Sequence, residues 1–400
     1  MSKIRSTIAA FAAATVLWSV GAQARPAIVI DADTGRVLHA EDATREWFPA
    51  SLTKLMTVYV VLSKVKAGQI SLDTPLLYTE RAQREPPSKM GFPLNTIITV
   101  DNALKLLMVK SANDVAVTLA EGTGGSVEAF VGDMNRAAFK LGMTQSHFEN
   151  PNGWHNPAQY TSARDMAILA RAIYRDFPQS AGYYDIQALM LGKKLVRGHN
   201  RILGRFEGAD GMKTGFTCPS GFNLVASAQR GKRHLIAVVL GHETAAERTQ
   251  RAAELLDSGF GSFSFWRTGQ SVETLPAVAG DPPDLRPEVC GKKKKSAPEI
   301  GETEDDGQQV VGVRRNEVLS GLVTSAYAAE SKPLLMDRPA PVVPVPAFLG
   351  PNPNGPKEFI ALAATMAPTA PAAPAASDTT PAAAGPAVPL PKPRPAKAKK

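Results

Sequence analysis

The sequence of 400 residues is poor in cysteine, in long apolar runs and, towards its end, in aromatic side chains. Its two cysteines, Cys218 and Cys290, allow one intramolecular disulfide, and the sequence leaves the pairing open because it gives no distance between them. No segment after residue 24 is apolar for long enough to span a bilayer. From Pro368 to Lys400 there is no aromatic residue, so this stretch has too little apolar area to offset its ordering entropy.

Proline is distributed unevenly and divides the chain. Of the 32 prolines, 21 lie after residue 280, whereas the preceding part has an ordinary globular density. This pattern predicts one folded domain over residues 25–265. A Pro/Ala-rich, basic and largely disordered tail is expected over residues 266–400.

The net charge of +8 is concentrated in two short runs of the predicted tail. Residues 292–295 are four lysines, and five further positive charges lie between Lys392 and Lys400. Such a tail could make electrostatic contact with the cell wall or a membrane, or it could simply be solvated. Nucleic acid is disfavoured as a partner, because the N-terminus, described next, has the features of an export signal.

The N-terminus has the three parts of a secretory signal peptide. Lys3 and Arg5 are followed by an apolar run of about a dozen residues, and Ala22-Gln23-Ala24 supplies a cleavage site. Residues 1–24 are therefore predicted to be a cleaved signal. We expect an exported, periplasmic protein that is soluble or peripheral to the inner membrane.

The secondary-structure signals place strands at both ends of the folded part. Residues 27–30 and 36–39 read as a hairpin around a turn, and residues 212–217, 222–228 and 235–240 read as later strands. Helical spacing marks a run from Leu52 that ends before Gly68, a helix capped by Asp101, and residues 164–174 and 244–256. The middle is expected to be all-helical. This order favours an α/β (α+β) sandwich, an antiparallel sheet flanked by helices, over a parallel βαβ series.

Three short motifs occur in order along this chain. Ser51-Leu52-Thr53-Lys54 opens the first long helix, Ser111-Ala112-Asn113 lies at a break between two helices, and Lys213-Thr214-Gly215 lies on a later strand. Taken singly, each motif is explained by helix capping or by a strand end with a turn glycine. Their joint appearance in an exported chain indicates a catalytic site.

Ser51 and Lys54 have the spacing of a nucleophile and its base. Residues three apart at a helix start lie on the same face, and a serine hydroxyl needs a base to become a nucleophile. A lysine amine can act as that base when burial and nearby positive charge lower its pKa, and Lys213 is a candidate for that charge. Free backbone N–H groups at the helix start can face a developing oxyanion.

The motifs resemble those of the low-molecular-mass penicillin-binding proteins that act as serine-type D-alanyl-D-alanine carboxypeptidases. The similarity extends from Ala27 to Phe265 and includes residues 48–57, 150–153, 162–167, 210–217 and 220–228. The resemblance implies the sandwich fold of penicillin-binding proteins and serine β-lactamases. The implied substrate is the pentapeptide stem of peptidoglycan, which loses its last D-alanine through an acyl-enzyme, and β-lactams would acylate the same serine.

The resemblance also implies roles for single residues. Ser51 would be acylated, Lys54 would be the general base, and Ser111 would relay protons. Asn113 would hold the substrate backbone, and the strand residues would bind the terminal carboxylate or complete the oxyanion hole; these are Lys213, Thr214, Gly215 and Phe216. No cofactor is implied, and no histidine has metal-ligand spacing.

Some features depart from the family pattern or leave alternatives open. Tyr160 and the His199-Asn200 pair stand where relatives carry other residues, and we interpret His155 and His199 as structural or rim residues. A DD-endopeptidase would use the same motifs, and a non-catalytic wall-binding protein is the alternative from another class. A fast β-lactamase is disfavoured because no Glu-x-x-Leu-Asn pattern lies between Ser111 and Lys213.

Overall fold

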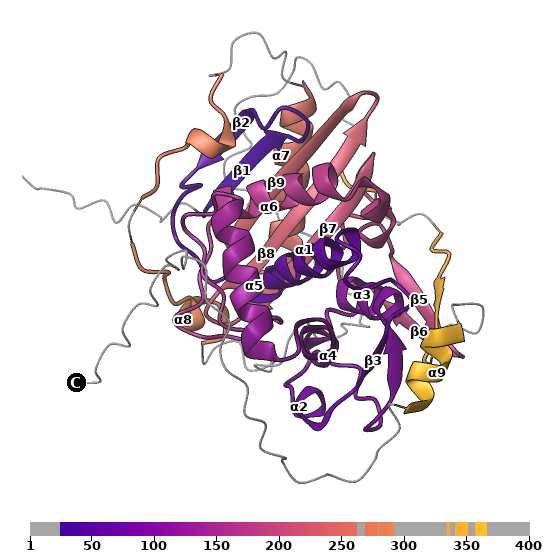
Figure 1. Cartoon of the computed structure of the whole chain (residues 1–400). Helices are drawn as coiled ribbons and strands as arrows, with labels where there is room; N and C mark the ends of the chain where they lie inside the picture. Colours follow the sequence, from indigo (N-terminus) through magenta and orange to yellow (C-terminus); the bar gives the residue numbers. More distant parts are fainter. Residues whose placement is uncertain are drawn as a thin grey trace, which may run out of the picture.

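The computed structural model of the chain describes residues 25–261, 269–278, 280–291, 334–336, 341–350 and 357–365 (Figure 1). The predicted signal peptide and both runs of basic residues lie outside these ranges. Within the described part of the chain, no helix has the length and apolarity needed to cross a membrane.

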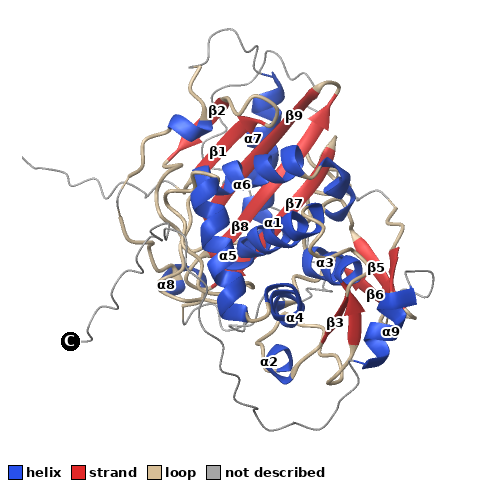
Figure 2. Ribbon diagram, viewed as in Figure 1, coloured by secondary structure: helices blue, strands red, loops and turns tan. Residues whose placement is uncertain are grey.

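The described elements follow one another as strands, then mainly helices, then strands again (Figure 2). The first group is β1 (Ala27–Asp31), β2 (Val37–Glu41), the 3-10 turn η1 (Ala50–Leu52), α1 (Thr53–Lys66), β3 (Pro75–Leu77), α2 (Glu80–Gln83), β4 (Ile97–Thr99), α3 (Val100–Val109), α4 (Asn113–Gly124), α5 (Val127–Lys140) and α6 (Ala163–Asp176). The second group is η2 (Pro178–Tyr183), β5 (Ala188–Leu191), β6 (Lys194–Arg197), β7 (Ala209–Thr217), β8 (Gly221–Arg230), β9 (Arg233–His242), α7 (Ala245–Gly261), η3 (Val272–Thr274), α8 (Arg286–Val289), β10 (Val345–Ala347) and α9 (Lys357–Thr365).

The main sheet has the order β2-β1-β9-β8-β7, and all of its pairs are antiparallel. Side chains of β9 alternate between two cores, as the two-residue period of a strand requires. Leu235, Ala237 and Val239 pack with α7, whereas Ile236, Val238 and Leu240 belong to the larger core on the opposite face. Figure 2 shows α7 behind the sheet and α6 in front of it. The predicted antiparallel sandwich is confirmed.

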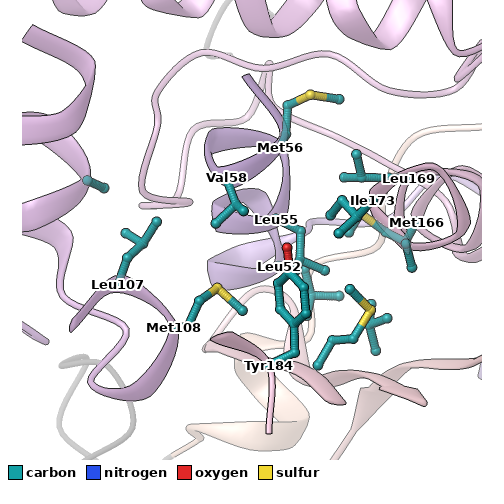
Figure 3. Close-up of a cluster of buried hydrophobic side chains, with 14 of the residues drawn as sticks. Leu52, Leu55, Met56, Val58, Leu107, Met108, Met166, Leu169, Ile173 and Tyr184 are labelled. Atoms are coloured by element: carbon teal, nitrogen blue, oxygen red, sulfur yellow. The ribbon is translucent and has the colours of Figure 1, made fainter. Parts of the chain in front are cut away.

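Helix α1 lies in the interior and is buried almost all round. Its apolar side chains meet those of α3 and α6 in the cluster of Figure 3, whose labelled members are Leu52, Leu55, Met56, Val58, Leu107, Met108, Met166, Leu169, Ile173 and Tyr184. A helix that is apolar on all sides is typical of a core position. The start of α1 is therefore held by packing from several directions.

Two local expectations were wrong. Thr99, not Asp101, caps α3, because its extended backbone lets Oγ1 accept a hydrogen bond from Asn102 N at 3.3 Å. Asp101 instead forms an ion pair with Lys105 at 2.7 Å. The middle of the chain is also not all-helical, because β3 and β4 form one small sheet and β5 and β6 belong to another. These strands are only three or four residues long and lack a clear alternating pattern.

Segments beyond residue 265, the predicted end of the domain, pack against the folded part. Val272 is fully buried, and its backbone N–H donates to Gly35 O at 2.9 Å beside the hairpin of β1 and β2. Further along, β10 pairs in parallel with β5, and Gly350 N donates to Ile97 O at 2.7 Å. The folded part thus extends into the predicted tail, held by contacts that are distant in sequence.

Candidate active site

Ser51 lies in the 3-10 turn η1 that immediately precedes α1. The residue before it, Ala50, has a φ of +48°, a conformation that a residue with a Cβ adopts only when its surroundings impose it. Gly153 packs against this turn so closely that a Cβ on it would lie 1.9 Å from Ala50 O. The backbone around Ser51 is therefore fixed in a strained form by its neighbours.

Lys54 lies in the first turn of α1 and is completely buried. Its Nζ lies 3.0 Å from Ser51 Oγ, and it donates to Asn113 Oδ1 at 2.7 Å and to Asn152 O at 2.5 Å. Lys54 Nζ therefore lies within hydrogen-bond distance of the Ser51 hydroxyl, and two further oxygens hold it there.

Ser111 and Asn113 lie at the connection between α3 and α4. Ser111 has a φ of +60° and is largely buried, and Asn113 is the first residue of α4. The Asn113 side chain bridges two parts of the site, because its Nδ2 donates to Pro86 O at 2.9 Å and to Pro87 O at 3.2 Å. Its predicted contact with a substrate backbone stays a prediction.

Strand β7 forms the edge of the main sheet and runs beside η1. A Cβ on Gly215 would lie 3.1 Å from the backbone nitrogen of Ser51, so glycine permits the strand to approach the turn. The side chains of Lys213 and Thr214 are almost fully buried on this strand, and Lys213 Nζ donates to Thr214 O at 2.8 Å. The structure thus brings the third motif next to the first.

A pocket opens in front of Ser51. Its lining consists of Ser51, Pro87, Ser88, Ser111, Asn113, Gly153, Trp154, His199, Phe216 and Thr217. Four of these were candidate site residues from the sequence: Ser51, Ser111, Asn113 and Phe216. The remaining candidates lie outside the lining. Lys54 contacts Ser51, and Lys213, Thr214 and Gly215 lie on β7, which also contains Phe216.

Sequence reasoning missed the second wall of the pocket. Pro87 and Ser88 come from the segment before β4, and no motif marks them. Residues 150–153 are Asn-Pro-Asn-Gly, which predicts a turn in the backbone. The sequence does not predict that this turn lies beside Ser51. Histidine 199 lines the pocket, whereas His155 packs edge-on against Phe48 with ring centroids 4.8 Å apart, and burial lowers its pKa.

An aromatic stack and a buried arginine continue from Phe216 of the pocket lining. The rings of Phe216 and Phe222 are stacked with centroids 4.1 Å apart, and the Arg248 guanidinium lies 5.5 Å from the centroid of Phe222. Arg248 is 1% exposed and donates to Asn223 O at 3.3 Å. This end of the sheet therefore contains a second buried cation besides Lys213, which sequence reasoning did not single out.

A disulfide links the end of β7 to the segment around α8. Cys218 and Cys290 are bonded, with their Cα atoms 5.7 Å apart. Cys218 directly follows Thr217 of the pocket wall, and Leu285 N donates to Pro219 O at 3.0 Å. The pairing left open by the sequence is thus present, and it fastens residues 285–290 beside the pocket.

The chain matches the family model of D-alanyl-D-alanine carboxypeptidases over residues 12–244. D-alanyl-D-alanine carboxypeptidase DacF of Bacillus subtilis is 34% identical over 265 residues, which are 64% of this chain and 68% of that protein. DacA of Haemophilus influenzae is 37% identical over 262 residues, covering 64% of this chain and 67% of the relative. The matches therefore span about two thirds of these relatives.

Solved structures give the same result. The D-alanyl-D-alanine carboxypeptidase DacD from Francisella tularensis is 31% identical with a TM-score of 0.58, over 64% of this chain and 74% of that one. Penicillin-binding protein D2 from Listeria monocytogenes, solved with cefotaxime bound, is 27% identical with a TM-score of 0.54, over 60% of this chain and 97% of that one. The resemblance inferred from the motifs is confirmed: this chain belongs to the D-alanyl-D-alanine carboxypeptidase family of penicillin-binding serine peptidases.

Proposed function

We propose that Ser51 is the nucleophile with which this serine-type carboxypeptidase removes the terminal D-alanine from peptidoglycan stem pentapeptides. One observation carries the proposal: the buried Lys54 Nζ lies 3.0 Å from Ser51 Oγ and is held by hydrogen bonds to Asn113 Oδ1 and Asn152 O. This arrangement places an amine that, in its neutral form, can take a proton within reach of the hydroxyl that opens onto the pocket.

In the acylation step, Lys54 takes the Ser51 proton while Oγ attacks the carbonyl carbon of the penultimate D-alanine. The carbonyl oxygen becomes an oxyanion, and the backbone N–H groups of Ser51 and Phe216 are the proposed donors to it. The close approach of Gly215 to the nitrogen of Ser51 supports this assignment. The peptide C–N bond then breaks, and the proton held by Lys54 passes, with Ser111 as the proposed relay, to the departing D-alanine amine.

Deacylation repeats these steps with water. Water attacks the ester carbonyl, its proton goes to Lys54, and the ester bond breaks. Ser51 Oγ takes the proton back, which returns the enzyme to its starting state. A β-lactam would open its ring on the same oxygen and remain as an ester.

Substrate binding is assigned to the pocket walls and to β7. The terminal carboxylate of the substrate is anionic, and the buried cation of Lys213, next to Thr214, suits it. Asn113, which accepts a hydrogen bond from Lys54, also lines the pocket and is the proposed contact for the substrate backbone. The partners are therefore stem peptides and, as covalent inhibitors, β-lactams.

The protein is proposed to act in the periplasm, where this substrate lies. The signal-like residues 1–24 and the disulfide between Cys218 and Cys290 support an oxidising compartment. Peripheral contact of the basic tail with the wall or the membrane stays a prediction.

The first test is the intact mass of the mature protein after incubation with benzylpenicillin, beside the variant Ser51→Ala. We expect one covalent adduct on the wild type and none on the variant. D-alanine release from a pentapeptide, compared with cleavage of a cross-linked dimer, then separates the carboxypeptidase from an endopeptidase. A folded wild type that forms no adduct would contradict the proposal and favour a non-catalytic wall-binding protein.

A further inference from the structure

Glu85 lies beside the active site and has no part in the mechanism above. It is half-buried, and its Oε2 accepts a hydrogen bond from Asn152 Nδ2 at 2.7 Å. The other end of the same amide is also fixed, because Trp154 N donates to Asn152 Oδ1 at 2.8 Å. Glu85 and Trp154 together hold the Asn152 side chain from both sides.

Asn152 matters because its backbone oxygen accepts a hydrogen bond from Lys54. Asn113 Oδ1 also accepts one from Lys54, and the Asn113 amide is in turn held by Pro86 O and Pro87 O. These two acceptors are thus anchored by three consecutive residues of one segment, Glu85-Pro86-Pro87.

From this geometry we infer that Glu85 is a positioning residue of the reaction: by accepting the Asn152 amide N–H, it fixes the residue whose backbone oxygen holds Lys54 Nζ beside Ser51 Oγ. This inference rests on the proposed function. In this role Glu85 acts as a hydrogen-bond acceptor for Asn152. The position of the acceptor atom then matters more than the charge it carries.

The electrostatic surroundings of Glu85 fit such a role. Burial raises the pKa of the carboxyl group, and Asp114 raises it further, whereas the Asn152 hydrogen bond and the charge of Arg81 lower it. Whichever protonation state Glu85 has, one of its oxygens can accept the Asn152 N–H. A glutamine at this position offers the same acceptor without the charge.

Two substitutions distinguish position from charge. Glu85→Gln keeps the length and the acceptor, and Glu85→Asp keeps the charge but withdraws the acceptor by one methylene. We expect the rate of acylation by benzylpenicillin, followed by intact mass, to stay within about threefold of wild type for Glu85→Gln. For Glu85→Asp and Glu85→Ala we expect a fall of about 10- to 100-fold, because displacing a catalytic group by about 1 Å has effects of this size.

The effect should appear in kcat on the pentapeptide, with KM little changed, because the substrate-binding walls are intact. Glu121→Ala is the matched control, since Glu121 also accepts a side-chain hydrogen bond, but from Thr79 at 2.6 Å and not from Asn152, the residue whose backbone oxygen holds Lys54. We expect wild-type rates from it. In a double-mutant cycle, Glu85→Ala should have no further effect once Asn152→Ala has removed the amide.

The outcomes separate the two proposals. If the wild type and Glu85→Asp acylate equally fast while thermal unfolding shows both folded, the positioning role is overturned and the proposed function stands. If Glu85→Gln is as slow as Glu85→Ala, the acceptor account is overturned in favour of the charge. A wild type that is not acylated at all contradicts the proposed function itself.

Discussion

Two serines lie near opposite ends of β7, and each is accompanied by a nitrogen base. Ser51 lies beside Gly215 towards the end of the strand, with Lys54 Nζ 3.0 Å away. Ser227 is paired with Gly211 at its start, and His234 is the nearby base. Ser51 lines a pocket, whereas Ser227 is fully buried.

The second group, which we call the Asp210 cluster, consists of Asp210, Ser227, His234 and Tyr174. Ser227 Oγ donates to Asp210 Oδ1 at 2.6 Å, and His234 Nε2 lies 3.1 Å from the other carboxylate oxygen. Tyr174 OH lies 2.8 Å from Ser227 Oγ. The serine is fully buried.

The difference teaches that a serine, a base and an acid are not sufficient for catalysis. In the Asp210 cluster, both the Ser227 hydroxyl and the His234 imidazole contact the Asp210 carboxylate. His234 is therefore directed at Asp210 and not at Ser227. At Ser51 the amine of Lys54 is itself the hydrogen-bond partner of the hydroxyl, at 3.0 Å, and Asn113 Oδ1 and Asn152 O hold that amine in place. Which group receives the serine proton, together with access from solvent, separates a reactive site from a structural network.

The largest expected effect comes from removing the two bases in turn. Lys54→Ala should lower the acylation rate with benzylpenicillin by about 10²- to 10⁴-fold, because loss of a general base has effects of this size. His234→Ala should leave it within about twofold. Equal losses in the two variants, at equal thermal stability, would mean that the two ends of β7 are coupled and would break the comparison.

The next effect concerns the disulfide, which is attached to the Ser51 end of β7 only. Replacing Cys218 and Cys290 together by serine should lower the free energy of unfolding by about 2–4 kcal/mol, measured in guanidinium, since the bond closes a long loop. Hydrogen exchange should speed up at Phe216 and Thr217 and stay unchanged around Asp210. Uniform acceleration along β7 would contradict a local role.

The smallest effect concerns His242, which lies at the opposite end of β9 from His234. Burial, helped by the charges of Arg25, Arg251 and Arg248, lowers the pKa of His242 from 6.5 to about 4. Between these values the unfolded chain binds a proton that the folded protein does not. The free energy of unfolding should therefore fall as the pH falls from 7 to 5, by about 2 kcal/mol from this residue.

The check is chemical denaturation across this pH range. His242→Gln should show a shallower slope, and His234→Gln, in which His242 is intact, should keep the contribution of His242. A slope identical to wild type in His242→Gln would contradict the assignment.

The sequence predicted those parts of the fold and site that depend on local spacing. The alternation in β7, β8 and β9 and the three-residue spacing of Ser51 and Lys54 are periodic features, and both are present in the structure. Thr99 rather than Asp101 caps α3 because β4 ends directly before that helix, which no local pattern indicated.

The parts that the sequence did not predict depend on contacts between distant segments. Asn152 meets Lys54 across 98 positions, and Glu85 meets Asn152 across 67. The contacts of β10 with β5 likewise join residues far apart, in a stretch whose composition predicted disorder. Composition reflects the average hydrophobicity and charge of a segment. A three-residue strand such as β10 needs only the free edge of another strand to pair with.

The position of β1 in the sheet sets an order of events during synthesis. β1 lies between β2, its neighbour in the chain, and β9, so that Ala27 pairs with Val239 more than 200 residues later. Until that residue has been made, one edge of the first hairpin has no partner, and such an edge can pair with other chains. Closure over so long a loop is slow. Strand β7, which contains the third motif, is also made late. A nascent chain therefore contains Ser51 and Lys54 long before it has an active site.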